Sequence, residues 1–320
     1  MRLVSAKDYP AELLALISQA KQRIIIAAML VCADDRTAPI LDALEAALAR
    51  GVRVYILGDV YFRVFREGNK RWQQRLTVAE TERRLGLLRQ KGAQVVLYGR
   101  LGLNPFKGRS HLKVTIVDDT VYSFGGVNFV GKAFENADYM LRHADRRLAD
   151  KLDQLVTNAP HTHEDMTWLI DSQTTLLFDG GQPGVSVIYR TVCELAARAK
   201  RIYYVSQMVP SGELAQRILD TEYVAYFNRP QQSSKYVALS LVLDNPFGRL
   251  KNRYHRRQYL HAKFMLFELK DGTKTLVSGS HNFSERGVRY GTQEIAIRST
   301  DEKLWEQLYD FLKTSVDSVG

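Results

Sequence analysis

Two related stretches dominate the sequence: HLKVTIVDDTVYSFGGVN over residues 111–128 and HAKFMLFELKDGTKTLVSGSHN over residues 261–282. Each begins with His-x-Lys, reaches an acidic residue five positions after the Lys, and ends in a small-residue turn with Asn. A single copy of so short a pattern arises easily by chance. Two copies in one chain indicate a duplicated site with a chemical role.

The repeated positions carry side chains of similar chemistry. They are His111, Lys113, Asp118, Gly125, Gly126 and Asn128 in the first copy, and His261, Lys263, Glu268, Gly279, Ser280 and Asn282 in the second. The second copy has Glu268 in place of Asp and a longer segment before its turn. Because that segment contains Asp271-Gly272 between apolar runs, we expect a lengthened β-hairpin there.

The duplicated pattern resembles the signature of the phospholipase D superfamily, H-x-K-x4-D followed by G-[GS]-x-N, and most of all its bacterial cardiolipin synthase and phosphatidyltransferase members. The resemblance implies an α/β fold of two pseudo-symmetric lobes, each with a mixed sheet flanked by helices. It also implies that Asp118 and Glu268, together with Gly126 and Ser280, support the local fold of the motifs.

The residue types of the motifs suit chemistry on a phosphodiester. Side chains alternate along a strand, so each His and the Lys two positions later leave the same face. Negative charge grows on the phosphate oxygens during substitution, and the Lys and Asn side chains are expected to stabilise it. One imidazole would attack phosphorus to give a phosphohistidine, and the other would donate a proton to the leaving oxygen. The resemblance favours His111 as nucleophile and His261 as acid, and the chemistry needs no metal or other cofactor.

Two further carboxylates, Asp138 and Glu294, follow the two motifs at similar distances. The resemblance implies that such acids orient the catalytic imidazoles, each accepting a hydrogen bond from Nδ1 of the His in the opposite half. Asp138 would then serve His261, and Glu294 would serve His111. The alternative is that both are ordinary carboxylates at strand edges.

The chain of 320 residues is long enough for two cores, and segments outside the motifs also repeat. LISQAKQRIIIAAML near the N-terminus matches LAARAKRIYYVSQMV around Lys200, and PILDALEAALARGVRVYIL predicts the later part of a βαβ unit. A polar stretch over residues 158–167 predicts a boundary. We therefore expect a first phospholipase D-like lobe over residues 1–160 and a second over 161–320, packed face to face.

The sequence is strongly basic, with 45 Lys and Arg against 35 Asp and Glu and a net charge of +10, which favours an anionic partner. An anionic phospholipid membrane surface and nucleic acid both fit, and no obligate protein partner is inferred. NPFGRLKNRYHRRQ from Asn245 leads into the second motif, as NPFKGR from Asn104 leads to the first. Five bases of the former segment are predicted to bind substrate, with a solvated loop as the alternative: Arg249, Lys251, Arg253, Arg256 and Arg257.

Two other features have alternative interpretations. The basic segment over residues 63–91, which contains Trp72, has an incomplete apolar stripe typical of a helix that covers the first sheet or lies at a membrane surface. His161 and His163 are close enough in sequence to suit a metal, but their polar surroundings favour a linker. We predict no metal site.

The sequence also predicts the compartment. It contains no run of 18 apolar residues and no apolar signal segment near the N-terminus. Cys32 and Cys193 lie in apolar surroundings, which is typical of buried thiols. We expect a cytoplasmic enzyme that is peripheral to the inner face of the membrane.

Three functions remain open from the sequence. The first is a cardiolipin synthase-like phosphatidyltransferase or phospholipase D that works through a phosphohistidine. The second is a phospholipase D-family nuclease that cleaves DNA or RNA, because GSHNFSERG from Gly279 resembles nuclease members. The third is a catalytically inactive scaffold that binds anions, which the two intact His-x-Lys pairs disfavour.

Overall fold

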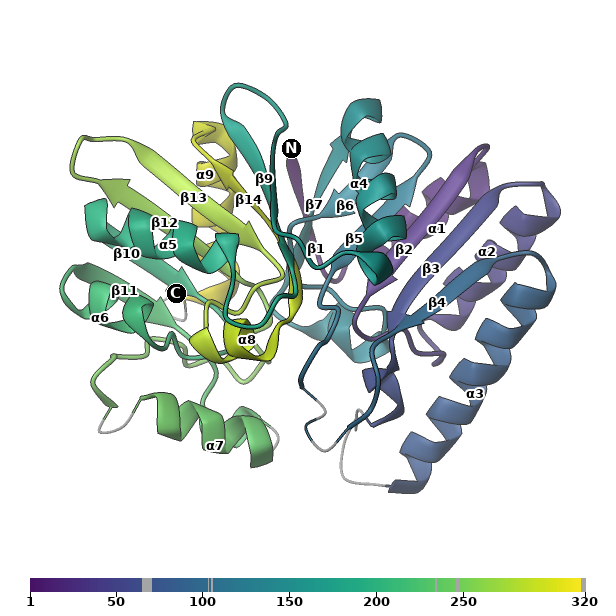
Figure 1. Cartoon of the computed structure of the whole chain (residues 1–320), viewed down its shortest axis with the longest axis horizontal. Coiled ribbons are helices and arrows are strands. Elements are labelled where there is room, and N and C mark those ends of the chain that lie inside the picture. Colours follow the sequence, from purple (N-terminus) through teal and green to yellow (C-terminus); the bar gives the residue numbers. More distant parts are fainter. Residues whose placement is uncertain (65–70, 103, 105, 234, 246–247, 318–320) are drawn as a thin grey trace.

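The computed structural model describes residues 1–64, 71–102, 104, 106–233, 235–245 and 248–317. Two seven-stranded mixed sheets lie side by side, with helices on their outer faces and between them (Figure 1). This confirms the predicted α/β fold. Residues 103, 105 and 246–247 of the two predicted approach loops, and the side chain of Trp72, lie outside the described part.

The first sheet has the strand order β1-β7-β6-β5-β2-β3-β4. Its parallel pairs are β2 with β3 and β3 with β4, and its other neighbours are antiparallel. The elements are β1 (Arg2–Ser5), α1 (Tyr9–Gln19), β2 (Arg23–Ala28), α2 (Ala38–Ala49), β3 (Arg53–Asp59), η1 (Val60–Arg63), α3 (Arg71–Gln90), β4 (Gln94–Tyr98), β5 (Lys113–Val117), β6 (Thr120–Ser123), η2 (Gly131–Glu135), β7 (Tyr139–Ala144), α4 (Arg146–Asn158) and η3 (Ala159–His161).

The second sheet has the order β11-β10-β12-β13-β14-β9-β8, and its parallel pair is β10 with β11. The elements are β8 (Met166–Leu169), β9 (Thr174–Gly180), α5 (Val187–Arg198), β10 (Ala199–Val205), α6 (Glu213–Leu219), β11 (Glu222–Tyr226), η4 (Pro230–Gln232), α7 (Lys235–Asp244), β12 (Phe264–Leu269), β13 (Lys274–Gly279), α8 (Glu285–Tyr290), β14 (Gln293–Ser299), α9 (Glu302–Phe311) and η6 (Leu312–Val316).

The two sheets repeat one arrangement. Read from opposite ends, β7-β6-β5-β2-β3 of the first sheet matches β14-β13-β12-β10-β11 of the second, with the motif strands β5 and β12 in the same place. The predicted βαβ unit is present as β2-α2-β3 with parallel strands. The sequence repeats that flank the motifs therefore correspond to repeated structure.

Local details agree with most of the sequence expectations. Strands β12 and β13 form the lengthened hairpin, and Gly272 at its turn has a φ of +86°, which a glycine adopts without strain. The later part of the 63–91 segment is helix α3, and its Leu85 and Leu88 are buried against the first sheet. One detail differs: β5 begins at Lys113 and β12 at Phe264, so both motif His residues precede the strands that we expected to contain them.

A single apolar core joins the two halves. It combines residues of both sheets with the inner helices α4 and α9, and its rings include Tyr139, Phe264 and Phe311. Tyr139 has its ring centroid 5.9 Å from that of Phe264 and 5.0 Å from that of Phe311. Two other cores lie on the outer faces, under α1 and α2 and under α5 and α6. The division into domains at residue 160 stays a prediction, because both halves share the central core.

Cys32 and Cys193 are both buried, as predicted. In the described residues, no helix combines the length and the hydropathy that a membrane-spanning segment requires.

Asp118 holds the start of β2 in place. Its carboxylate accepts hydrogen bonds from the backbone N–H groups of Lys21, Gln22 and Arg23, at 3.0, 2.8 and 3.1 Å. Burial acts to raise the pKa of Asp118, but these donors outweigh it and hold the pKa below its ordinary value. Asp118 has a φ of +51°, a left-handed conformation that Asp tolerates better than most residues.

We expect Asp118→Ala to lower the free energy of unfolding by about 3 kcal/mol at neutral pH, about 2 from the lost charged acceptor and about 1 from the left-handed backbone. The exposed neighbour offers a control, since Asp119→Ala should change stability by less than about 0.5 kcal/mol. The difference between Asp118→Ala and the parent should shrink as the pH falls below about 4, because a carboxyl with a lowered folded-state pKa stabilises only while ionised. Chemical denaturation across pH measures both; equal stability of the two variants would contradict this role.

Candidate active site

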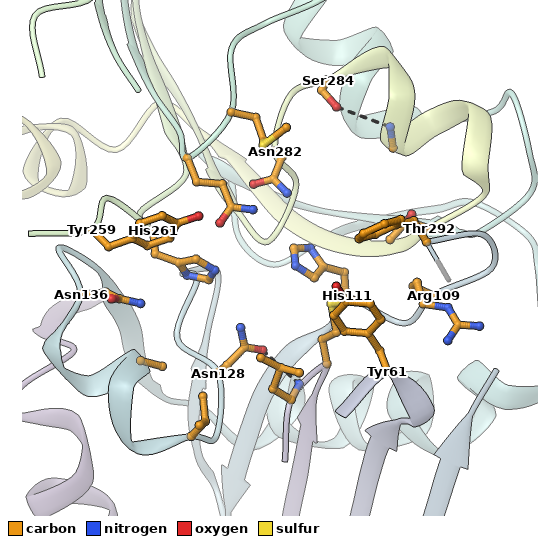
Figure 2. Close-up of a pocket in the computed structure, with 18 of the residues that line it drawn as sticks. Tyr61, Arg109, His111, Asn128, Asn136, Tyr259, His261, Asn282, Ser284 and Thr292 are labelled. Atoms are coloured by element: carbon orange, nitrogen blue, oxygen red, sulfur yellow. Dashed lines mark hydrogen bonds between the residues drawn. The ribbon is translucent and has the colours of Figure 1, made fainter. Parts of the chain in front are cut away.

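A cavity of about 1020 Å³ lies between the two halves and contains both motif His residues in its lining. Figure 2 shows His111 and His261 facing each other across this cavity, with Asn128 and Asn282 on opposite walls. The structure therefore brings the two copies of the motif to one site.

Backbone contacts between the halves set the position of each His. Ser110 forms a β-bridge with Gln293, and Leu260 forms one with Ala137. The His111 N–H donates to the Gln293 carbonyl at 2.8 Å, and the His261 N–H donates to the Ala137 carbonyl at 3.0 Å. In each bridge, the residue before a His is paired with the residue before a carboxylate of the opposite half.

These bridges place each carboxylate against the imidazole of the opposite half. His261 Nδ1 lies 2.7 Å from Asp138 Oδ2, and His111 Nδ1 lies 2.9 and 3.0 Å from the two carboxylate oxygens of Glu294. This is the cross-pairing that the sequence analysis expected. A carboxylate that accepts from Nδ1–H fixes the tautomer in which Nε2 is free to accept a proton or attack an electrophile.

The turn residues of the motifs hold these carboxylates. Asp138 Oδ1 accepts from the Gly126 N–H at 3.1 Å, and the hydroxyl of Ser280 donates to Glu294. A Cβ on Gly126 would lie 2.6 Å from the His261 carbonyl oxygen and 2.7 Å from Asp138 Oδ2, so a larger residue would displace the pair. The two halves thus use a backbone N–H and a hydroxyl for the same task.

Both motif Lys residues are fully buried beneath the His side chains. Lys113 Nζ donates to the His111 carbonyl at 2.9 Å, and Lys263 Nζ donates to the His261 carbonyl at 2.6 Å. Lys263 Nζ also lies 3.2 and 3.3 Å from the ring nitrogens of His261. An ammonium has three N–H donors, so these contacts leave donors for a phosphate held at the imidazoles.

The two Asn residues differ in their contacts. Asn128 Oδ1 accepts from the Leu30 N–H at 3.2 Å, which fixes the amide so that its NH₂ group is the free end. Asn282 Oδ1 is buried and has no hydrogen-bond partner within the described part of the chain. A buried polar atom without a partner is costly and rare away from functional sites.

The buried charges lower the basicity of the site. Burial, with the positive charge of Lys263, lowers the pKa of His261 to about 4, and burial with Lys113 and Lys263 lowers the pKa of His111 well below its ordinary value. Burial also lowers the pKa of Lys263 to about 8 and raises the pKa of Glu294. Both imidazoles are therefore neutral near pH 7 in the empty site, and an anionic phosphate would raise their pKa values.

The remaining motif acids lie away from the imidazoles. Asp118 binds the backbone at the start of β2, as described above, and Glu268 accepts from the Tyr203 hydroxyl at 3.4 Å. Asp118 thus accepts hydrogen bonds from the backbone, whereas Glu268 accepts one from a side-chain hydroxyl.

Of the five bases that the sequence analysis assigned to substrate, Arg257 lines the cavity. Arg256 points elsewhere, because its guanidinium donates to the backbone carbonyls of Thr314 and Asp317. Arg249, Lys251 and Arg253 are exposed outside the described lining. Of the five predicted substrate-binding bases, one therefore lines the cavity, one is bonded to the C-terminal segment and three are exposed to solvent.

Sequence reasoning missed several polar residues of the cavity. They are Arg109, Lys132, His281 and Arg286. Arg109 forms a buried ion pair with Asp59 at 3.0 Å, and Asp59 also accepts from the Ser110 N–H at 2.8 Å, so this pair anchors the backbone just before His111. His281 lies inside the second motif, and its Nδ1 accepts from the Phe283 N–H at 2.8 Å, which leaves the proton on Nε2.

The possible metal pair does not form a site in the described residues. His161 and His163 are exposed, and no group of three or more His, Cys, Asp or Glu side chains there is placed to hold a metal ion.

Comparisons with known proteins give one family match and likenesses of fold. Residues 13–158 match the family described as cardiolipin synthase, PLD-like domain. The structure resembles phosphatidylserine synthase of Haemophilus influenzae with a TM-score of 0.75 at 12% identity, over 99% of this chain and 86% of that one. It resembles polyphosphate kinase of Porphyromonas gingivalis with a TM-score of 0.63 at 13% identity, over 98% of this chain and 49% of that one. Likenesses at such identities show a shared fold. No curated protein matches the sequence.

We expect Asp138→Asn and Glu294→Gln each to reduce turnover of a phosphodiester by roughly 10²- to 10⁴-fold, because an amide opposite Nδ1 favours the wrong tautomer. Asp145→Asn is a matched control, since that carboxylate caps α4 by accepting from the Leu148 N–H and lies outside the described cavity lining. Steady-state kinetics and a thermal melt of each variant measure the effect. Unchanged turnover in both Asp138→Asn and Glu294→Gln would show that the cross-pairing has no catalytic role.

Proposed function

We propose that this chain is a phospholipase D superfamily enzyme that transfers phosphatidyl groups to an alcohol or to water through a phosphohistidine, as a cardiolipin synthase-like phosphatidyltransferase or a phospholipase D. The proposal is supported by the family match over residues 13–158 and by the fold shared with a phosphatidylserine synthase. The observation that carries the proposal is the pair of neutral imidazoles facing one cavity, each held by a carboxylate of the opposite half. This arrangement supplies one nucleophile and one proton carrier on opposite sides of a bound phosphorus.

In the first step, Nε2 of one imidazole attacks phosphorus and forms a P–N bond. The P–O bond to the leaving head group breaks, and the opposite imidazolium gives its proton to that oxygen. In the second step, the now neutral imidazole takes the proton of an incoming hydroxyl, whose oxygen forms a new P–O bond as the P–N bond breaks. No redox partner is needed, and the two imidazoles return to their starting states.

We assign the role of nucleophile to His111, as the resemblance of the motifs favours. Figure 2 shows Tyr61, Arg109 and Thr292 on the His111 side, and Asn136 and Tyr259 on the His261 side, so both sides of the cavity carry polar groups. In a substitution with nucleophile and leaving group in line, the leaving head group lies opposite the nucleophile. The head group would then lie on the His261 side, where His261 would protonate it.

The buried Lys and Asn residues would stabilise charge in the transition state. Lys113 and Lys263 lie directly beneath the imidazoles, and Asn128 presents its NH₂ group from the first half. In a site screened from water, such preorganised donors act more strongly than they do in bulk solvent. Substrate binding would also raise the low pKa of His261 and so populate the imidazolium that the first step requires.

The lipid class is supported by the cavity and by the nature of the related proteins. The cavity is large enough for a phospholipid head group and glycerol, and its lining includes the apolar residues Met29, Leu30, Val64, Phe106 and Val130. The matched family is described as cardiolipin synthase, and a related structure is a phosphatidylserine synthase. We therefore favour phospholipid over nucleic acid as substrate.

Incubating the protein with phosphatidylglycerol vesicles and analysing the lipids by mass spectrometry tests this proposal. We expect cardiolipin or phosphatidic acid from the parent, and at least about 10³-fold less from His111→Ala and from His261→Ala, because each removes a group required in both steps. The exposed His161→Ala serves as control and should match the parent. A folded parent that leaves lipid intact but cleaves DNA or RNA would overturn the lipid proposal in favour of the nuclease.

A further inference from the structure

Helix α7 presents an apolar face to solvent. Leu239, Val242 and Leu243 have exposed fractions of 58%, 55% and 61%. Their spacing along the helix places them on one face, while Leu241 on another face is buried in the core of the second half. Contiguous apolar side chains of this size on a surface typically mark a binding site for protein or membrane.

The helix is attached to the cavity at both of its ends. Gln231 and Gln232 of η4, which precedes α7, line the cavity. Asp244 at the other end forms an ion pair at 2.8 Å with Arg286, which also lines the cavity. The apolar face of α7 therefore lies next to the proposed site for the head group.

The first half contributes exposed apolar residues on the same side of the molecule. Figure 1 shows that the N-terminal end of α3 and helix α7 lie along one edge of the molecule, below the two sheets. Leu76, in the second turn of α3, is 62% exposed, and Val64, which lines the cavity, is 39% exposed. Apolar side chains thus flank the cavity from both halves.

Positive charge follows helix α7 in the chain. Arg249, Lys251 and Arg253 follow α7 and are exposed, and within the described residues none of their side chains forms an ion pair. Arg257, further along the same segment, lines the cavity. Bases beside an apolar helix face complement an anionic lipid surface, where the bases contact phosphates and the apolar side chains enter the interface.

We propose that the apolar face of α7 and the exposed bases Arg249, Lys251 and Arg253 form a docking surface for an anionic phospholipid bilayer, with Leu76 of α3 as its counterpart on the first half. Docking in this way places the cavity over lipid head groups. The phosphate of a phospholipid can then reach the imidazoles while its acyl chains stay in the bilayer. The inference rests on the proposed lipid function and assigns to Arg249, Lys251 and Arg253 a role in docking.

The test compares binding to vesicles with catalysis on a soluble substrate. The double variant Leu239→Gln/Leu243→Gln changes the apolar face, and Leu169→Gln is the control, because Leu169 is also 58% exposed but lies on β8, at the opposite edge of the second sheet from β11. Cosedimentation with vesicles of phosphatidylcholine, alone or with phosphatidylglycerol, measures binding. Dihexanoyl phosphatidylglycerol below its micelle concentration reports on catalysis.

We expect the parent and Leu169→Gln to bind phosphatidylglycerol-containing vesicles, and to bind pure phosphatidylcholine vesicles at least tenfold more weakly. The double variant should lose at least tenfold in binding to the anionic vesicles while it retains turnover of the soluble lipid. Replacing Arg249, Lys251 and Arg253 by Gln should likewise reduce vesicle binding and make the remaining binding less sensitive to salt.

Several outcomes would overturn the inference. The first is that the parent protein does not bind vesicles, and the second is that the double variant binds them as tightly as the parent does. The third is that the parent forms a dimer and the double variant does not, which would show that the apolar face of α7 binds a second copy of the chain. Preferential binding of the basic surface to single-stranded nucleic acid over anionic vesicles would also overturn it. Failure of the proposed function can be distinguished from failure of the docking inference. If the proposed function is wrong, the soluble lipid is not turned over, whether or not the protein binds vesicles.

Discussion

The site depends on two hydrogen bonds that cross between the halves of the chain, from His111 to Glu294 and from His261 to Asp138. Neither half can orient its own imidazole, since the carboxylate partner belongs to the other. The adjacent β-bridges, Ser110 with Gln293 and Leu260 with Ala137, fix the same cross-pairing through the backbone. The duplicated fold therefore makes one site rather than two.

Much of the surrounding structure follows from this constraint. The halves must pack closely, and they do so through one apolar core in which the Tyr139 hydroxyl also lies 2.7 Å from the Ser278 hydroxyl of the opposite half. Space beside the carboxylates is so limited that Gly126 admits no side chain. Lys113 and Lys263 are also fully buried. Burial of the imidazoles, together with the positive charge of these Lys residues, lowers the pKa values of His111 and His261.

The sequence predicted the parts of the fold and site that depend on local pattern. The duplicated motif, the hairpin at Gly272 and the β2-α2-β3 unit are examples, and they are present. The cross-pairing of Asp138 and Glu294 was expected from the family resemblance instead, and the structure contains these contacts. The sequence could not predict residues whose position depends on how distant loops pack against each other. Lys132 and Arg286 line the cavity because η2 and α8, which are far apart in the sequence, both border it. Arg256 turns towards the C-terminal segment, although Arg257 lines the cavity. His281 had a signal, its position inside the second motif, but its first-half counterpart Val127 carries no such chemistry.

In the proposed mechanism, the two halves contribute different chemical roles to one reaction. The decisive experiment stops the reaction of a phosphate-labelled lipid at alkaline pH, where phosphohistidine survives, and maps the labelled peptide. We expect label on the peptide that contains His111. With a leaving group activated enough to depart unprotonated, His261→Ala should accumulate more label during a single turnover. Label on His261, or turnover with inversion at phosphorus and no labelled His, would rule out this division of roles.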